Sequence, residues 1–97
     1  MDNKEILSLR RNLKSLQKQL GDLGPVMRGS VVLLGPKDKA KRLCFSLNKD
    51  GKTQMIYLGK SREEKAREYS QNYKRLLEIV EDMTAINMAL LKENAAQ

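Results

Sequence analysis

The chain has 97 residues, 40% of them hydrophobic, and carries 19 Lys and Arg against 12 Asp and Glu. A chain of this length buries one small core, so we expect a single domain over residues 1–97 that gains stability by oligomerising. It contains no histidine and a single cysteine, Cys44. This composition excludes an internal disulfide and removes the commonest general base and metal ligand, so we expect no enzyme, no metal and no cofactor.

The excess positive charge is concentrated in the first part of the sequence. Residues 1–60 hold thirteen Lys and Arg against five acidic residues, whereas residues 61–97 hold six against seven. This asymmetry predicts either attraction to a polyanion or a basic surface that only aids solubility. No apolar run approaches the ~20 residues of a membrane span, and the N-terminus lacks a signal-peptide pattern, so we expect a soluble cytoplasmic protein.

The first predicted element is a helix over residues 1–24. Asp2 or Asn3 can cap its start, and its apolar residues recur at alternating three- and four-residue steps. Gly24 and Pro25 end it, because glycine accepts left-handed geometry and proline disfavours helix at the preceding residue. The apolar positions are Ile6, Leu9, Leu13, Leu16 and Leu20.

Residues 26–60 predict a small basic sheet of three antiparallel strands, at about residues 29–34, 42–47 and 53–58. Asp50 and Gly51 favour a hairpin between the last two strands. Two registers remain open. A two-residue turn pairs Phe45 with Ile56, whereas a three-residue turn with a bulge at Gly51 opposes Phe45 to Met55.

A long helix is predicted over residues 61–95, where Ser61 and Glu64 have the form of a capping box. If it continues to about Glu93, at ~1.5 Å per residue it is ~48 Å long, against ~25 Å for the first helix between Asn3 and Leu20, so about half of its apolar seam lacks a partner within the chain. We therefore expect an α+β fold in which the two helices form an antiparallel pair and the long helix also supplies the seam of a homodimer. Asn87 either fixes the register of that seam by pairing with its symmetry mate or faces solvent. The predicted dimer interface comprises Tyr73, Leu76, Val80, Met83, Asn87 and Leu90.

Four short motifs carry a family resemblance: LGPVMRGS at residues 23–30, GK at 51–52, YL at 57–58 and YKRLL at 73–77. Over residues 20–91 the chain resembles a group of small uncharacterised prokaryotic proteins that are often encoded near transposases. Those relatives have a cysteine-rich loop where residues 35–42 of this chain contain no cysteine, so the resemblance implies no metal site here. The order of three strands, a YLG exit at 57–59 and a helix is also similar to the arm-type DNA-binding domains of tyrosine recombinases.

Two functions fit this pattern. The first is a non-catalytic, duplex DNA-binding accessory protein of a mobile element or phage, in which the basic sheet enters the major groove. Aromatic residues, at 4%, are too scarce for base stacking on single strands. The second is a helical dimerisation or adaptor module, with a larger protein as partner and no role with nucleic acid.

The sheet supplies the candidate DNA contacts. Its second strand places Leu43, Phe45 and Leu47 on one face and Arg42, Cys44 and Ser46 on the other, and we expect Cys44 to act as a small buried hydrophobe. The predicted nucleic-acid-binding residues are Arg28, Lys37, Lys39, Lys41, Arg42, Lys49, Lys52 and Lys60.

Overall fold

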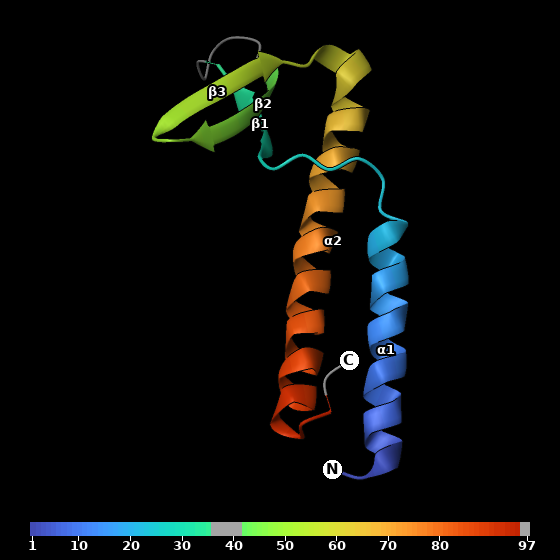
Figure 1. Cartoon of the computed structure of the whole chain (residues 1–97). Helices are drawn as coiled ribbons and strands as arrows, with labels where there is room; N and C mark the ends of the chain where they lie inside the picture. Colours follow the sequence, from blue (N-terminus) through green and yellow to red (C-terminus); the bar gives the residue numbers. More distant parts are fainter. Residues whose placement is uncertain (36–41, 96–97) are drawn as a thin grey trace. The chain divides into compact units, whose positions relative to one another are not determined.

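A computed structural model describes residues 1–35 and 42–95 of the chain (Figure 1). The elements follow in the order α1 (Asn3–Gly21), β1 (Ser30–Leu34), β2 (Arg42–Lys49), β3 (Lys52–Tyr57) and α2 (Gly59–Lys92). This order confirms the predicted α+β class, with an N-terminal helix, a three-stranded sheet and a long C-terminal helix. Within the described ranges, neither helix combines the length and the apolar character that crossing a membrane requires.

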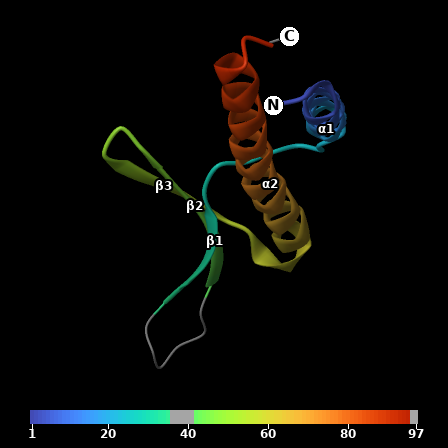
Figure 2. The same ribbon diagram turned by 90° about the horizontal axis from the view of Figure 1, so that it is seen from below.

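The strands form one twisted antiparallel sheet with β2 in the middle (Figure 2). Asp50 and Gly51 have positive φ angles of 53° and 76° and form the turn between β2 and β3. Two consecutive positive φ angles are typical of the two-residue type I′ hairpin turn. Phe45 accordingly pairs with Ile56, so the two-residue register is the correct one.

One face of the sheet packs against the start of α2. The alternation of side chains along β2 places Leu43 and Phe45 on this face. The buried cluster consists of Phe45, Leu58 and Ala66, with Met27, Val31 and Leu43 packed against it.

The segment between α1 and β1 crosses α2 and is fixed to it by hydrogen bonds (Figure 1). Gly29, at its end, has a φ angle of +133°, and a Cβ atom there would lie 2.6 Å from the carbonyl oxygen of Ser46 and 2.7 Å from the ring of Phe45. Only glycine fits this position. The bonds run from Asn72 Nδ2 to Pro25 O at 2.8 Å, from Met27 N to Tyr69 O at 3.1 Å, and from Ser70 Oγ to Gly29 O at 3.2 Å.

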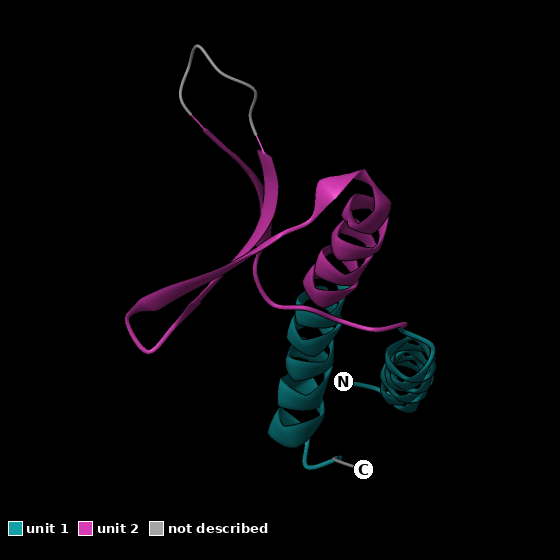
Figure 3. Cartoon of the chain, turned by 90° about the horizontal axis from the view of Figure 1, so that it is seen from above, with its two compact units in different colours: residues 1–23, 75–97 teal, residues 24–74 magenta. Residues whose placement is uncertain are grey.

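The chain divides into two compact units, which are coloured separately in Figure 3. The helical unit comprises Met1–Leu23 and Arg75–Gln97, and the sheet unit comprises Gly24–Lys74. The long helix α2 contributes its first turns to the sheet unit and its remaining turns to the helical unit.

Within the helical unit, α1 and the second part of α2 pack as an antiparallel pair. Leu13 and Leu16 of α1 are buried, as are Ile79 and Leu90 of α2. Polar contacts join the pair near both ends. The Arg75 guanidinium donates to Gln19 Oε1, Arg10 Nη2 donates to Ala95 O at 2.8 Å, and the N-terminal amine of Met1 lies 3.7 Å from Glu93 Oε2.

The helix ends settle two sequence predictions. Asp2 is the cap of α1, since its side chain accepts a hydrogen bond from the backbone N–H of Glu5 at 2.8 Å. The predicted capping box of α2 is wrong as a start signal, because the helix begins at Gly59 and Ser61 already lies inside its first turn. Residues 58–60 continue directly from β3 into the helix, which leaves no extended residue at Ser61 to serve as a cap.

The apolar seam predicted on α2 divides between two faces. Leu90 is fully buried and Leu76 and Met83 are half-buried, whereas Val80 and Asn87 are exposed. Steps of three and four residues place Leu76, Ile79, Met83, Ile86 and Leu90 on one face, which packs on α1. Three of the six predicted dimer residues, Leu76, Met83 and Leu90, therefore pack within the chain.

Candidate nucleic-acid interface

The sheet has a second face, turned away from Phe45 and α2, which we call the outer face. Its residues follow from the strand registers, because neighbours that pair across strands point to the same side. Among the described strand residues, this face carries hydroxyl and amide groups, one guanidinium and no carboxylate, together with three apolar side chains and the thiol of Cys44, which is half-buried and not buried as predicted. It consists of Ser30, Val32 and Leu34 of β1, Arg42, Cys44, Ser46 and Asn48 of β2, and Thr53, Met55 and Tyr57 of β3.

Two contacts fix the polar groups of the outer face. The guanidinium carbon of Arg42 lies 5.9 Å from the centre of the Tyr57 ring, which is cation–π distance. Thr53 Oγ1 donates a hydrogen bond to Asn48 Oδ1 at 2.6 Å. Arg42 and Asn48 lie at the two ends of this face, and these residue types form paired hydrogen bonds with guanine and adenine.

Of the predicted binding residues that the structure describes, only Arg42 belongs to the outer face. Lys49 and Lys52 pair with each other at the end of the β2–β3 hairpin, on the side of the sheet that carries Phe45. Arg28 precedes β1, and its Nη1 donates to Asn48 O at 2.9 Å. These cations flank the outer face and do not line it.

The remaining predicted residues have different outcomes. Lys60 is exposed in the first turn of α2, next to the exit of β3. Lys37, Lys39 and Lys41 lie outside the described residues.

Sequence reasoning missed Arg62 and most of the outer face. Arg62 Nη2 donates to Tyr57 O at 2.6 Å and its Nε donates to Leu58 O at 3.1 Å, so this side chain holds the connection from β3 to α2. The alternation of Arg42, Cys44 and Ser46 was the available signal for the outer face. Extending it to β3 requires the hairpin register, which the sequence leaves open.

A hollow of about 380 Å³ lies beside the hairpin on the side of the sheet that carries Phe45. Apolar side chains form most of it, and Arg28 and Lys49 add positive charge. The apolar part includes Met27, Phe45, Leu47 and Ile56.

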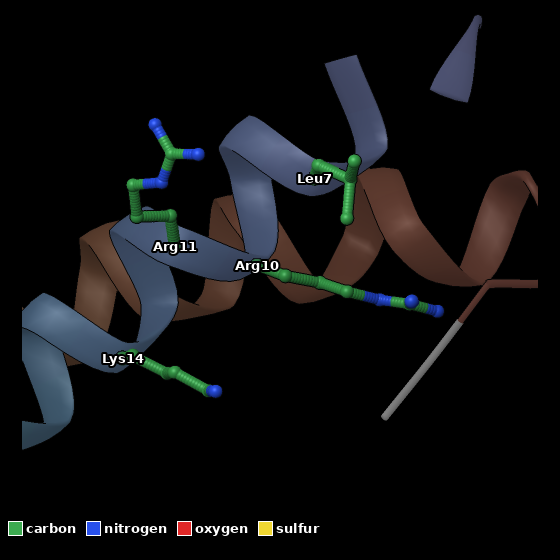
Figure 4. Close-up of a pocket in the computed structure, with 4 residues that line it drawn as sticks. All are labelled: Leu7, Arg10, Arg11 and Lys14. Atoms are coloured by element: carbon green, nitrogen blue, oxygen red, sulfur yellow. The ribbon is translucent and has the colours of Figure 1, made fainter. Parts of the chain in front are cut away.

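A second group of basic side chains lies on α1, around a hollow of about 600 Å³ (Figure 4). Figure 4 shows Arg10 and Lys14 extending to one side of α1, whereas Arg11 points away from them. Arg10 is engaged by Ala95 O at the end of α2. Arg10 therefore has a structural role within the helical unit, because it holds the end of α2.

The two units differ sharply in charge. By sequence, the sheet unit contains twelve Lys and Arg against five Asp and Glu, whereas the helical unit contains seven against seven. The whole net charge of +7 therefore belongs to the sheet unit. Positive charge on one compact unit attracts polyanions more strongly than the same charge spread over the molecule.

Comparisons with known proteins leave the family open, since no family model, curated protein or solved structure matches this chain. The resemblance to transposase-associated proteins and to recombinase arm domains stays a prediction from the motifs. Among residues 1–35 and 42–95, no three Cys, Asp or Glu side chains gather as metal ligands.

Proposed function

We propose that this chain is a non-catalytic, cytoplasmic duplex DNA-binding accessory protein of a mobile element or phage. One observation carries the proposal: the unit that holds the entire net charge of +7 also has a polar sheet face without a carboxylate among its described residues. Electrostatic attraction to phosphates supplies most of the affinity of DNA-binding proteins, and groups directed at base edges supply the specificity.

The dimensions of the sheet suit the major groove. Adjacent strands are ~4.8 Å apart, and the major groove of B-DNA is ~12 Å wide and admits two strands side by side, so two neighbouring strands of the sheet enter it while the third lies at its edge. In this arrangement the outer face enters the groove, the long side chains of Lys49 and Lys52 reach phosphates beyond the end of the β2–β3 hairpin, and Lys60 contacts the phosphates beside the exit of β3. Sheet-based readers bind DNA in this way.

Arg42 and Asn48 are the groups we assign to base reading. The Tyr57 ring restricts the Arg42 guanidinium, which lowers the entropy lost when it pairs with guanine. Asn48 accepts from Thr53, and its Nδ2 group has two further hydrogens for a base or a phosphate. The smaller Ser30 and Ser46 let the backbone approach the bases closely.

The test is a fluorescence-anisotropy titration of a random-sequence duplex at several salt concentrations. The double variant Lys49→Ala/Lys52→Ala should weaken binding to all duplexes and reduce the slope of log K against log salt by about two counterions. The matched control is Lys14→Ala/Lys18→Ala, which removes the same charge from the neutral helical unit and should leave both quantities nearly unchanged.

The variant Arg42→Lys distinguishes base-specific binding from attraction by charge alone. If selection from random duplexes yields a preferred sequence, Arg42→Lys keeps the charge but loses the paired hydrogen bonds. It should relax preference at one base pair, at a cost of ~1–3 kcal/mol. No binding of wild-type protein to any duplex at micromolar concentration and low salt contradicts the proposal.

The competing function is a helical adaptor that does not bind nucleic acid. A specific observation favours the protein-interaction part of this function: α2 has an exposed apolar face in the helical unit. The two functions use different units of the chain, and each has its own measurement.

A further inference from the structure

The part of α2 that packs on α1 has a second apolar face. Leu77, Val80, Met88 and Leu91 are 48%, 46%, 55% and 65% exposed. With Thr84 they lie at helical steps of three and four residues, so they form one stripe ~21 Å long. We call Leu77, Val80, Thr84, Met88 and Leu91 the second stripe.

The second stripe contains no charged residue and no unsatisfied hydroxyl. At 100° per residue, Glu78 and Asp82 lie about 120° and 160° from Thr84 around the helix, and Glu81 lies about 60° away, beside the edge of the stripe. Thr84 Oγ1 donates to Val80 O at 2.7 Å, so this threonine presents its methyl group at no hydrogen-bonding cost. The stripe can therefore be buried against another apolar surface without leaving one of its own polar side chains short of a hydrogen-bond partner.

The positions of the second stripe are symmetric about Thr84. Val80 and Met88 lie four residues to either side of it, and Leu77 and Leu91 lie seven residues to either side. When two such helices run antiparallel and cross at Thr84, Leu77 of one copy meets Leu91 of the other and Val80 meets Met88. Every apolar position then meets an apolar position, as an isologous twofold interface requires.

We propose that the second stripe binds a second copy of this chain, as an antiparallel homodimer centred on Thr84. The pairing confines the contact to the helical unit, where seven basic residues balance seven acidic ones. Each sheet unit, with a net charge of +7, is joined to α2 of the helical unit at residue 74, before Leu77, so the antiparallel pairing separates the two junctions along the helix axis and lowers the mutual repulsion of the charged units. A parallel pair would bring these charges to the same end.

The proposed dimer does not depend on DNA binding, but it would strengthen the DNA binding that we propose. Two sheet units on one particle can engage two DNA sites at once, and their avidity exceeds the affinity of either unit. The dimer interface also differs from the one that the sequence predicts, because Leu76, Met83 and Leu90 pack within the chain.

Single cysteines test both the contact and its direction, with Cys44→Ser as the background. Thr84→Cys should form a disulfide-linked dimer under mild oxidation, because the two copies of this residue meet at the crossing point. Leu91→Cys should not, since its two copies lie ~21 Å apart along the axis in the antiparallel pair. Mixing Leu77→Cys with Leu91→Cys should restore the cross-link. A cross-linked dimer of Leu91→Cys alone overturns the antiparallel arrangement.

Sedimentation equilibrium tests the dimer without cross-linking. Val80→Glu should shift the dissociation constant upward by at least tenfold, because a buried glutamate has no partner in the apolar stripe. Ala85→Glu is the matched control, since it adds the same charge about 140° around the same helix and should leave the dimer intact. Wild-type protein that sediments as a monomer at tens of micromolar overturns the proposal and leaves the DNA-binding one standing.

Discussion

Gly29 lies at a position of the sheet unit that only glycine can occupy without strain. Its φ angle of +133° is unfavourable for any side chain, and Ser46 O and the Phe45 ring occupy the space of a Cβ atom. Phe45 belongs to the buried cluster, so it cannot move without loosening the sheet from α2. The glycine of the MRGS motif therefore has a structural reason, whatever the motif means for kinship.

Gly29→Ala should lower the free energy of unfolding by about 2–4 kcal/mol, which combines backbone strain with overpacking. Urea denaturation followed by circular dichroism measures the change. Gly21→Ala is the control, because no atom lies within 4 Å of its Cβ position and alanine favours the end of α1. A Gly29→Ala protein with the wild-type midpoint would show that the segment before β1 can shift to make room.

At the level of elements, α2 is unusual because two of its sides are apolar. Ile79 is fully buried against α1, whereas the adjacent Val80 is 46% exposed on the second stripe. Ile79→Ala should destabilise the chain by about 2–4 kcal/mol, since it leaves a cavity, and Val80→Ala by less than about 1 kcal/mol. Denaturation at low micromolar protein, where dimerisation contributes little, measures both. Equal losses would place the two residues on the same face.

The sequence was sufficient to predict the elements of the fold but not the phase of α2. Helix and strand boundaries were predicted to within a few residues because capping residues, the Asp50-Gly51 turn and apolar spacing are local signals. Ile79 and Val80 are both apolar, as are Leu76 with Leu77 and Leu90 with Leu91, so two overlapping seams fit the same segment. Which seam meets α1 depends on packing between residues far apart in the chain.

The candidate site was predicted only in part for the same reason. The basic residues could be named from composition, and the alternation in β2 identified the side of Arg42. The contribution of Asn48, Thr53 and Tyr57 depends on the register between β2 and β3, where shifting by one residue reverses the face. Long-range pairing, not residue type, decides which polar groups share the outer face.

On the scale of the whole molecule, a neutral helical unit is joined to a sheet unit with a net charge of +7. Like charges on one small unit repel one another, and that repulsion is relieved when an anion binds or when salt screens it. The same charge that we propose attracts DNA thus lowers the stability of the unit that carries it. This loss of stability is confined to the sheet unit, because the helical unit has no excess charge.

Added salt should therefore stabilise the two units unequally. Raising sodium chloride from 20 to 300 mM, roughly from a 20 Å to a 6 Å screening length, should slow amide hydrogen exchange in β2 and β3 more than in α1. We expect a difference of a few tenths of a kcal/mol to about 1 kcal/mol in local opening free energy, measured by mass spectrometry of peptides from each unit. Lys49→Ala/Lys52→Ala should reduce the salt effect in the strands, whereas Lys14→Ala/Lys18→Ala should leave it unchanged. Equal slowing in both units would mean that salt acts through general burial and not through the charge of the sheet unit.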